Sequence, residues 1–373
     1  MEEKQWIEDV AEKIRHKMIL VACRNRHNIP YSTLNGRFDD CSGEKITWWT
    51  NGFWGGMMWQ MYQATGNELY HEIAVENEKM LDANLMMAGG LNHDNGFKWL
   101  PTSVANYRKT GNEESCNRGM LAADNLAGRF NLAGAFIRAW NDAGDGKKAG
   151  WVIIDSMMNL PLLYWASETT HDPRYRQIAE RHADKVQEYF IRPDGSACHI
   201  VEFDPETGAF MKSHGGQGYG EGSAWTRGQA WAVYGFVLSY LHTNRKSYLE
   251  TAKHTADYFI ENIPESGLIP VDFRQPGTCT WEDSSAAAIA ACGFLQLAQV
   301  LKDKEALKYH REAVRLLKIL DKKRCNWKEE EDNLLEKCTA KYHSDRHEFA
   351  IIYGDYYFIE AIWKLTGQEL FIW

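Results

Sequence analysis

Two carboxylates in this 373-residue chain have surroundings that suit acid–base chemistry. Asp155 is the only charged residue in the run GWVIIDSMMNLPLLYWA (150–166), and an ionised carboxylate in apolar surroundings is costly unless it is paired, hydrogen-bonded or kept protonated. Asp94 follows His93 in the turn-like segment GGLNHDNGFKW (89–99). Two carboxylates in different surroundings can divide the roles of acid and base, and the buried one then holds its proton near neutrality. The structural alternatives are a turn-forming Asp94 and a capping or hydrogen-bonded Asp155.

Further polar groups that suit substrate binding lie in two loops and at the start of a predicted helix. His199 lies in the predicted strand or loop SACHIVEFDPETG, and Gln217 lies in the glycine-rich segment HGGQGYGEG, which lacks the GxxxxGK[ST] pattern of a phosphate-binding loop. Arg227 begins the predicted helix 225–241, where the helix dipole disfavours a cation. Its planar guanidinium suits a carboxylate, and helix N-termini attract anions, so these groups predict a site for an acid.

Aromatic residues are concentrated near the same positions. The chain has 15 tryptophans, more than core packing ordinarily requires. Aromatic rings can stack on the C–H faces of sugar rings, with core packing as the alternative for any one of them. The aromatic candidates are Trp49, Trp140, Trp225 and Tyr353. Together with Arg227 they predict an anionic sugar as the ligand.

The elements that must position these residues are helical nearly throughout. A recurring pattern, in which a helix ends near Thr and a charged amphipathic helix follows, marks residues 64–81, 169–186, 242–259 and, more weakly, 301–317. Helices poor in charge, of the kind that are buried, precede or follow them at 49–63, 151–166, 225–241, 282–298 and 353–365, with a sixth expected near 116–136. This alternation predicts an all-α fold, an (α/α)6 barrel of six inner and six outer helices in one domain over residues 1–373, in preference to an open solenoid.

The polar residues of the predicted inner helices fall at their N-terminal ends. Helix capping explains Ser284 and Asp283, but it fits Asp155 poorly and does not explain Arg227. Because the inner helices of such a barrel run parallel, these ends share one rim. We therefore expect the site at that rim.

Composition excludes several other classes of protein. The net charge is −9 without a basic patch, which argues against a nucleic-acid or membrane-surface role. The N-terminus does not resemble a secretory signal, no transmembrane helix is expected, and eight cysteines without a CxxC pair predict reduced thiols in the cytoplasm. Neither Cys325 with Cys338 nor His343 with His347 forms a recognised metal-binding spacing, so no metal is expected. We expect a monomer or a weak homodimer.

Seven segments carry a family resemblance in order along the chain. They are WTNGFWGG, NHDNGF, IIDSMMNLPLLYWASE, SACHIVEFDPETG, GSAWTRGQAWAVYGF, DSSAAAIAACG and YGDYYFIEA, which span residues 49–361. Together they resemble glycoside hydrolase family 88, the unsaturated glucuronyl hydrolases. The resemblance implies an (α/α)6 barrel without a cofactor. Its substrates would be oligosaccharides that polysaccharide lyases leave with a 4,5-unsaturated uronic acid at the non-reducing end, here of glycosaminoglycan type.

The resemblance also implies a reaction and a set of roles. A proton is delivered to C4, water adds to C5, and the resulting hemiketal opens and releases the remaining sugar. Asp155 would be the principal acid/base and Asp94 the second catalytic carboxylate. The expected substrate-binding residues are His93, His199, Gln217, Trp225, Arg227, Trp49, Trp140 and Tyr353.

One departure from the family pattern lies in the segment HGGQG. Where the family has His directly before Gln217, this chain has Gly216, with the nearest histidine at His214. The sugar contacts of this loop are therefore open. The alternative functions are an unsaturated rhamnogalacturonyl hydrolase that acts on pectin fragments, a conventional inverting glycosidase, and a non-catalytic sugar-binding helical scaffold.

Overall fold

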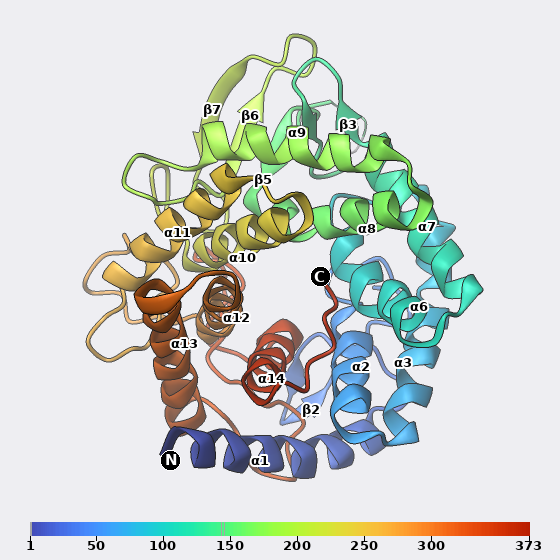
Figure 1. Cartoon of the computed structure of the whole chain (residues 1–373), viewed down its shortest axis with the longest axis vertical. Coiled ribbons are helices and arrows are strands. Elements are labelled where there is room, and N and C mark those ends of the chain that lie inside the picture. The colour runs from blue at the N-terminus through green and yellow to red at the C-terminus, as the bar shows by residue number, and fades with distance from the viewer. Residues whose placement is uncertain (1, 143, 145) are drawn as a thin grey trace.

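A computed structural model describes residues 2–142, 144 and 146–373. Within these residues, six inner helical elements form a ring and six outer helices surround it, as Figure 1 shows down the barrel axis. The inner elements are α2 (Phe53–Thr65), the continuous stretch of α5 (Asn95–Trp99), η2 (Leu100–Val104) and α6 (Ala105–Thr110), then α8 (Leu160–Thr170), α10 (Thr226–Thr243), α12 (Ser284–Val300) and α14 (Ile352–Thr366). The outer helices are α1 (Glu2–Arg24), α3 (Glu68–Met80), α7 (Glu113–Gly128), α9 (Pro173–Phe190), α11 (Lys246–Glu261) and α13 (Asp303–Lys323). The predicted (α/α)6 barrel is confirmed.

The turn from an inner to an outer helix is built in the same way in four hairpins. A threonine Oγ1 donates a hydrogen bond to the carbonyl four residues earlier and accepts one from the N–H two residues later, across a residue with left-handed backbone. The four turns are Thr65–Gly66–Asn67, Thr110–Gly111–Asn112, Thr170–His171–Asp172 and Thr243–Asn244–Arg245. In three of them the third residue caps the outer helix through its side chain. These bonds are the physical basis of the repeated threonine pattern in the sequence.

Two predicted elements are wrong. The sixth inner element is residues 95–110, whereas α7, which overlaps the predicted 116–136, is an outer helix that exposes residues such as Leu121 (60 % exposed). The predicted inner helix 151–166 is three elements: the strand β5 (Trp151–Ile153), the 3₁₀ helix η3 (Ile154–Met158) and α8. Strand pairing of residues 151–153 and Pro161 at the second position of α8 prevent one continuous helix.

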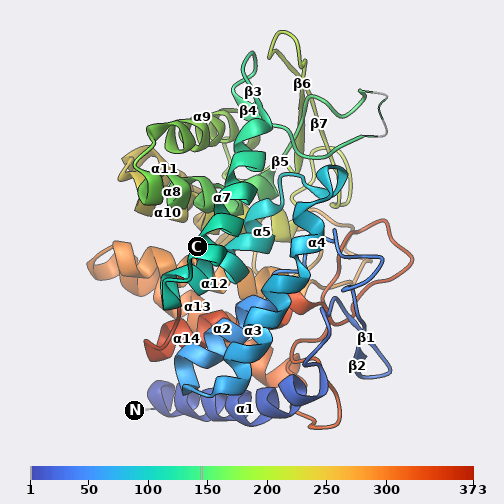
Figure 2. The same cartoon turned by 90° about the vertical axis from the view of Figure 1, so that its right-hand side faces the viewer.

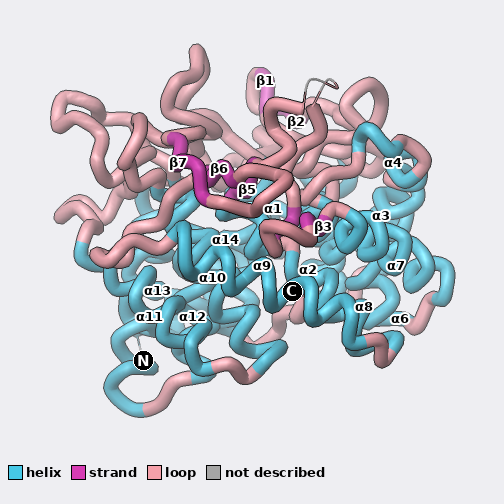
Figure 3. Tube along the Cα trace, turned by 90° about the horizontal axis from the view of Figure 1, so that it is seen from above, coloured by secondary structure: helices cyan, strands magenta, loops and turns pink. Residues whose placement is uncertain are grey.

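Short strands and long loops cover one end of the barrel, as Figures 2 and 3 show. The largest sheet pairs β5 with β6 (Ile200–Phe203) and β6 with β7 (Phe210–His214), all antiparallel. Two small hairpins, β1–β2 (Thr33–Leu34 and Arg37–Phe38) and β3–β4 (Phe130–Asn131 and Phe136–Ile137), and the short helices α4 (Asp82–Leu85) and η1 (Ala88–Gly90) complete the described elements. The inner helices begin at this covered end.

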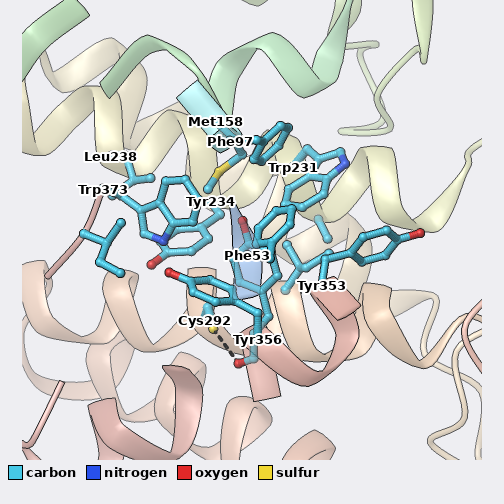
Figure 4. Packing of buried hydrophobic residues seen from close by; sticks show 14 of the residues in the cluster. Phe53, Phe97, Met158, Trp231, Tyr234, Leu238, Cys292, Tyr353, Tyr356 and Trp373 are labelled. Atoms are coloured by element: carbon cyan, nitrogen blue, oxygen red, sulfur yellow. Dashed lines mark hydrogen bonds between the residues drawn. The ribbon is translucent and has the colours of Figure 1, made fainter. Parts of the chain in front are cut away.

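The interior of the barrel is filled with aromatic side chains, of which Figure 4 shows a part. The last residue, Trp373, is buried there, stacked on Tyr357 at 5.9 Å and edge-on to Phe97 at 6.2 Å. The tail that carries it is fixed to α2, where Gln60 exchanges two hydrogen bonds with the backbone of Leu370. No helix in the described part of the chain is both long and apolar enough to cross a membrane.

Candidate active site

A pocket of about 370 Å³ lies at the covered end of the barrel. Its volume is in the range of small-molecule sites. Seven of the ten predicted site residues line it: Trp49, His93, Asp94, Trp140, Asp155, His199 and Gln217. Trp48, one of the aromatic residues expected around the rim, also lines it, whereas sequence reasoning did not place Thr47, Gly89, Gly90, Asn92 and Ile153 there. The GG of residues 89–90, directly before the Asp94 segment, was the available signal.

Asp155 lies on η3 between a strand and a helix, not within an inner helix. The pairing of β5 with β6 brings Ile153 opposite Ile200, and the N–H of Ile154 donates to the carbonyl of His199 at 3.0 Å. His199 Nε2 therefore lies 3.6 Å from Asp155 Oδ2. The Asp155 side chain is 15 % exposed and reaches the pocket, whereas its neighbours Ile154 and Ser156 are buried.

Asp94 reaches the same pocket from the start of α5. Its N–H donates to Asn92 Oδ1 at 2.8 Å, so the turn expected for this segment is present. The residue is 7 % exposed, and its carboxylate lies 3.3 Å from His93 Nε2. Turn formation and a place in the pocket are thus both properties of Asp94, rather than alternatives.

Asn159 joins the segments that carry the two carboxylates. Its Nδ2 donates to the carbonyl of Asp155 at 3.1 Å, and its Oδ1 accepts the N–H of Phe97 at 2.8 Å. Gly96 allows this approach, because a Cβ atom there would lie 2.5 Å from the Asn159 Cα. The spacing of Asp94 and Asp155 is therefore fixed by a buried amide and a glycine.

The electrostatics of the pair reverse the prediction made for Asp155. Burial raises the pKa of Asp94 to about 7, and the negative charge of Asp155 adds to this effect. Burial also acts to raise the pKa of Asp155, but His199, with its Nε2 3.6 Å from the carboxylate, outweighs it together with His93 and Arg227 and lowers that pKa. The proton near neutrality therefore lies on Asp94, and the expectation of a raised pKa for Asp155 is wrong. The pKa of Asp155 is lowered mainly by His199, which lies outside the run of residues 150–166.

Two other ionisable groups, His93 and Lys98, are buried near Asp94. Burial lowers the pKa of His93 to about 3, so this imidazole is neutral. Lys98 is fully buried and donates to Asn84 Oδ1 at 2.7 Å and to the carbonyl of Gly90 at 3.2 Å. Burial lowers the pKa of Lys98 to about 8, and its charge acts to lower the pKa of Asp94.

Three predicted substrate contacts lie in the wall behind the pocket. The Trp225 ring centroid is 4.3 Å from that of His199, and Tyr353 stacks on Trp49 at 5.2 Å. Arg227 is 1 % exposed and donates to Asp283 Oδ2 at 2.5 Å, to the carbonyls of residues 339 and 340, and to Gln217 Oε1 at 2.9 Å. These three residues support pocket-lining side chains, and both terminal nitrogens of the Arg227 guanidinium donate to protein acceptors.

The pocket wall also offers two aromatic surfaces. Trp49 packs on Phe97 at 5.3 Å as well as on Tyr353, and is only partly buried. Trp140 lies edge-on to His93 at 6.4 Å. Two indoles that line a pocket beside buried carboxylates suit a ring with both apolar C–H faces and polar groups.

A second, larger hollow does not have these features. About 630 Å³ in volume, it lies between α1 and the end of α14 and is lined mainly by charged and amide side chains of the helix surfaces, such as Glu8, Arg15 and Gln368. Among the described residues, no group of three or more His, Cys, Asp or Glu side chains is arranged to hold a metal ion. The pocket with Asp94 and Asp155 is therefore the candidate active site.

A double ring of helices with two carboxylates and tryptophans at one rim is the arrangement of a carbohydrate-active hydrolase. The sequence model of Glycosyl Hydrolase Family 88 matches residues 25–361, and the chain belongs to this family of enzymes.

Two curated relatives and one solved structure illustrate the similarity. An unsaturated glucuronyl hydrolase from Bacillus sp. (strain GL1) is 38 % identical over 334 residues, 87 % of this chain and 88 % of the relative. An unsaturated chondroitin disaccharide hydrolase from Streptococcus pneumoniae is 34 % identical over 88 % of this chain and 84 % of the relative. The crystal structure of the Bacillus sp. GL1 unsaturated glucuronyl hydrolase, described as responsible for glycosaminoglycan degradation, matches with a TM-score of 0.89 and 33 % identity, covering 95 % of this chain and 96 % of that one.

Proposed function

We propose that this enzyme removes the 4,5-unsaturated uronic acid from the non-reducing end of lyase-generated glycosaminoglycan oligosaccharides. The observation that carries the proposal is the pair Asp94 and Asp155 in one tryptophan-lined pocket of a family 88 barrel. Relatives that cover most of the chain bear the names of glucuronyl and chondroitin disaccharide hydrolases.

The reaction is the hydration of a vinyl ether. The C4=C5 double bond takes a proton at C4, and the oxocarbenium-like transition state takes the hydroxyl of water at C5. The C5 hemiketal opens to a ketone as its bond to the ring oxygen breaks, and that oxygen stays on C1. The C1 hemiacetal then collapses to an aldehyde and releases the remaining sugar as an alcohol. One water molecule is consumed, and the proton used at C4 is recovered from that water.

The two carboxylates enter this reaction with one proton between them. In the resting pocket that proton lies on Asp94, whose pKa is about 7, while Asp155 is ionised beside His199. An unsaturated uronate adds a negative charge and displaces water, and both effects raise the pKa of a neighbouring carboxyl. Substrate binding beside Asp155 thereby favours transfer of the proton from Asp94 to Asp155, which delivers it to C4. The Asp155 carboxylate then takes a proton from the attacking water, and the return of that proton to Asp94 restores the resting pair.

Binding rests on the pocket walls. Trp49 and Trp140 stack on the sugars, and Gln217, whose Oε1 is held by Arg227, uses its amide nitrogen as a donor to the substrate. Arg227 does not meet the uronate carboxylate directly in this assignment. It contributes by orienting Gln217.

The test is a substrate panel with the purified enzyme. Lyase-digested chondroitin and hyaluronan are expected to lose the absorbance of the conjugated double bond, while the saturated disaccharides remain intact. Preferential turnover of digested rhamnogalacturonan would reassign the substrate to pectin fragments, and hydrolysis of saturated substrates would indicate a conventional glycosidase. Binding without turnover of any of them would indicate a sugar-binding protein.

A further inference from the structure

One backbone turn controls how His199 faces Asp155. Residues 215–218 form a turn in which the N–H of Gly218 donates to the carbonyl of Gly215 at 2.9 Å. The first central residue, Gly216, has φ +59°, as in type II′ turns, which favour glycine at this place. A Cβ atom on Gly216 would lie 1.9 Å from His199 Nδ1. Both the torsion and the close approach to the imidazole require a residue without a side chain.

The same turn sets the tautomer of His199. The backbone N–H of Gln217 donates to His199 Nδ1 at 2.8 Å. A backbone N–H can only donate, so Nδ1 of this imidazole is the acceptor and the ring proton lies on Nε2. Nε2 is the nitrogen that lies 3.6 Å from Asp155 Oδ2. The proton of His199 is thus directed at the carboxylate.

We propose that Gly216 is a positioning residue. Because it has no side chain, the Gln217 N–H can donate to His199 Nδ1 and keep the Nε2 proton directed at Asp155. The consequence for catalysis rests on the role proposed for Asp155, whereas the effect on His199 does not.

The charged and titratable groups that face Asp155 define the expected pH effect. They are His199, His93, Arg227 and Asp94. Burial acts to raise the pKa of Asp155, and His199, whose Nε2 proton is directed at the carboxylate, is the first of the groups that act to lower it. If His199 loses its alignment, the pKa of Asp155 rises. The acidic limb of the pH profile of kcat/KM, where Asp155 takes up a proton, then moves to higher pH.

The primary variant is Gly216→Ala, with Gly222→Ala as the matched control. Gly222 lies in the same loop with φ +73°, and a Cβ on it would meet no atom within 4 Å. Both variants therefore carry the torsional strain of a non-glycine residue, and only Gly216→Ala meets His199. We expect Gly216→Ala to lower kcat/KM for the unsaturated chondroitin disaccharide by about 10- to 100-fold, the scale of a misplaced catalytic group. Its acidic limb should move to higher pH, while Gly222→Ala stays within about twofold of wild type with an unshifted limb.

A double-mutant cycle with His199→Ala isolates the contact. With the imidazole removed, the added Cβ has room, so Gly216→Ala should cost no further activity in that background. The melting temperature of Gly216→Ala should fall below that of Gly222→Ala, and the loss should vanish in the double variant. Histidine ¹⁵N spectra give a readout independent of substrate: the His199 signals should report an unprotonated Nδ1 in wild type and Gly222→Ala, and should change in Gly216→Ala.

Three results would overturn the proposal: equal behaviour of the two glycine variants, losses that multiply in the double variant, or His199 signals unchanged in Gly216→Ala. If Gly216→Ala does not fold, a double variant that also fails to fold while His199→Ala folds would overturn it as well. Failure of the proposed function has a different signature, because wild type would then be inactive on the disaccharide while the melting-temperature cycle and the spectra still report on the contact.

Discussion

Glu360 and the pair Asp94 and Asp155 are carboxylates inside the same barrel, and they differ in the hydrogen-bond donors around them. Farther along α14 from the pocket, Glu360 accepts hydrogen bonds from the Tyr234 hydroxyl at 2.5 Å and from Trp373 Nε1 at 2.8 Å, with Lys364 at 4.0 Å. At the pocket, the polar side chains nearest to the carboxylates are two histidines, His93 at 3.3 Å from Asp94 and His199 at 3.6 Å from Asp155. Glu360 and Asp94 are buried and Asp155 is 15 % exposed, so the main difference between the two sites is the number of donors around the carboxylates.

The difference separates a structural use of buried charge from a chemical one. A buried carboxylate with several donors stays ionised and stabilises one arrangement of its neighbours. A buried carboxylate without them keeps hydrogen-bonding capacity for a substrate, and its pKa can reach the range where protons are exchanged. Substitutions at Glu360 should therefore affect folding, and substitutions at the pocket should affect turnover.

The largest expected effect is on turnover at the pocket. Asp155→Asn should reduce kcat by about 10² to 10⁴ or more, because the group acts in both protonation and water activation. Its free energy of unfolding should stay within about 1 kcal/mol of wild type, since the amide replaces a partly exposed carboxylate of the same shape. Steady-state kinetics and urea unfolding measure the two quantities. Retention of more than about a tenth of the activity would contradict the role of Asp155.

The matching change in the partnered group should affect stability. Glu360→Ala leaves the Tyr234 hydroxyl and the Trp373 indole N–H without their acceptor, whereas Lys364 keeps Glu369 at 3.0 Å. Each buried donor left unpaired costs about 1–3 kcal/mol. The KM of the remaining folded enzyme should be unchanged. Urea unfolding compares it with Glu8→Ala, an exposed carboxylate on α1 whose loss should cost less than about 0.5 kcal/mol. Equal stability of the two variants would show that the partners of Glu360 contribute nothing.

Local signals in the sequence predicted much of the barrel. The threonine turns that join inner to outer helices are made by bonds within a few residues, so their pattern is visible in the chain. The missed inner element, residues 95–110, contains Pro101 and the buried Lys98 and passes through the π-helical turn η2, which hides its apolar character. The turn Thr110–Gly111–Asn112 at its end repeats that of Thr65–Gly66–Asn67 and could have located it.

The sequence predicted which residues line the site, but it did not predict their charge states. Asp94, Asp155 and His199 were chosen for residue type and surroundings, and they line one pocket. The charge state of Asp155 depends on His199, which reaches it through strand pairing, and the environment of Arg227 depends on Asp283, 56 residues away. Contacts of this kind come from the tertiary fold, and no local pattern reports them.

Asp94→Asn should change the free energy of unfolding by a smaller amount than Glu360→Ala, and in the opposite direction. The pKa of Asp94 is raised from 3.8 to about 7 in the folded chain, so folding favours the protonated form, and this contribution to stability is lost as pH rises from about 4 to 7. Asp94→Asn removes the charge that is costly above pH 7. We expect the variant to be more stable than wild type by about 1–4 kcal/mol at pH 8 and by less at pH 5, while its activity falls. Urea unfolding at both pH values tests this, and a variant less stable than wild type at pH 8 would contradict the raised pKa.

The smallest expected effect is a shift of the alkaline limb in the pH profile of kcat/KM. If the carboxylate pair must hold one proton, kcat/KM should fall about tenfold per pH unit above pH 7, where Asp94 ionises. The positive charge of Lys98 lowers the pKa of Asp94, so Lys98→Met should move this limb to higher pH by up to about one unit. Lys364→Met removes a buried lysine beside Glu360 instead, and should leave the limb in place although it destabilises the fold. A limb that moves equally in both variants would mean that the loss of a buried charge anywhere in the barrel, rather than the charge facing Asp94, sets the pH dependence.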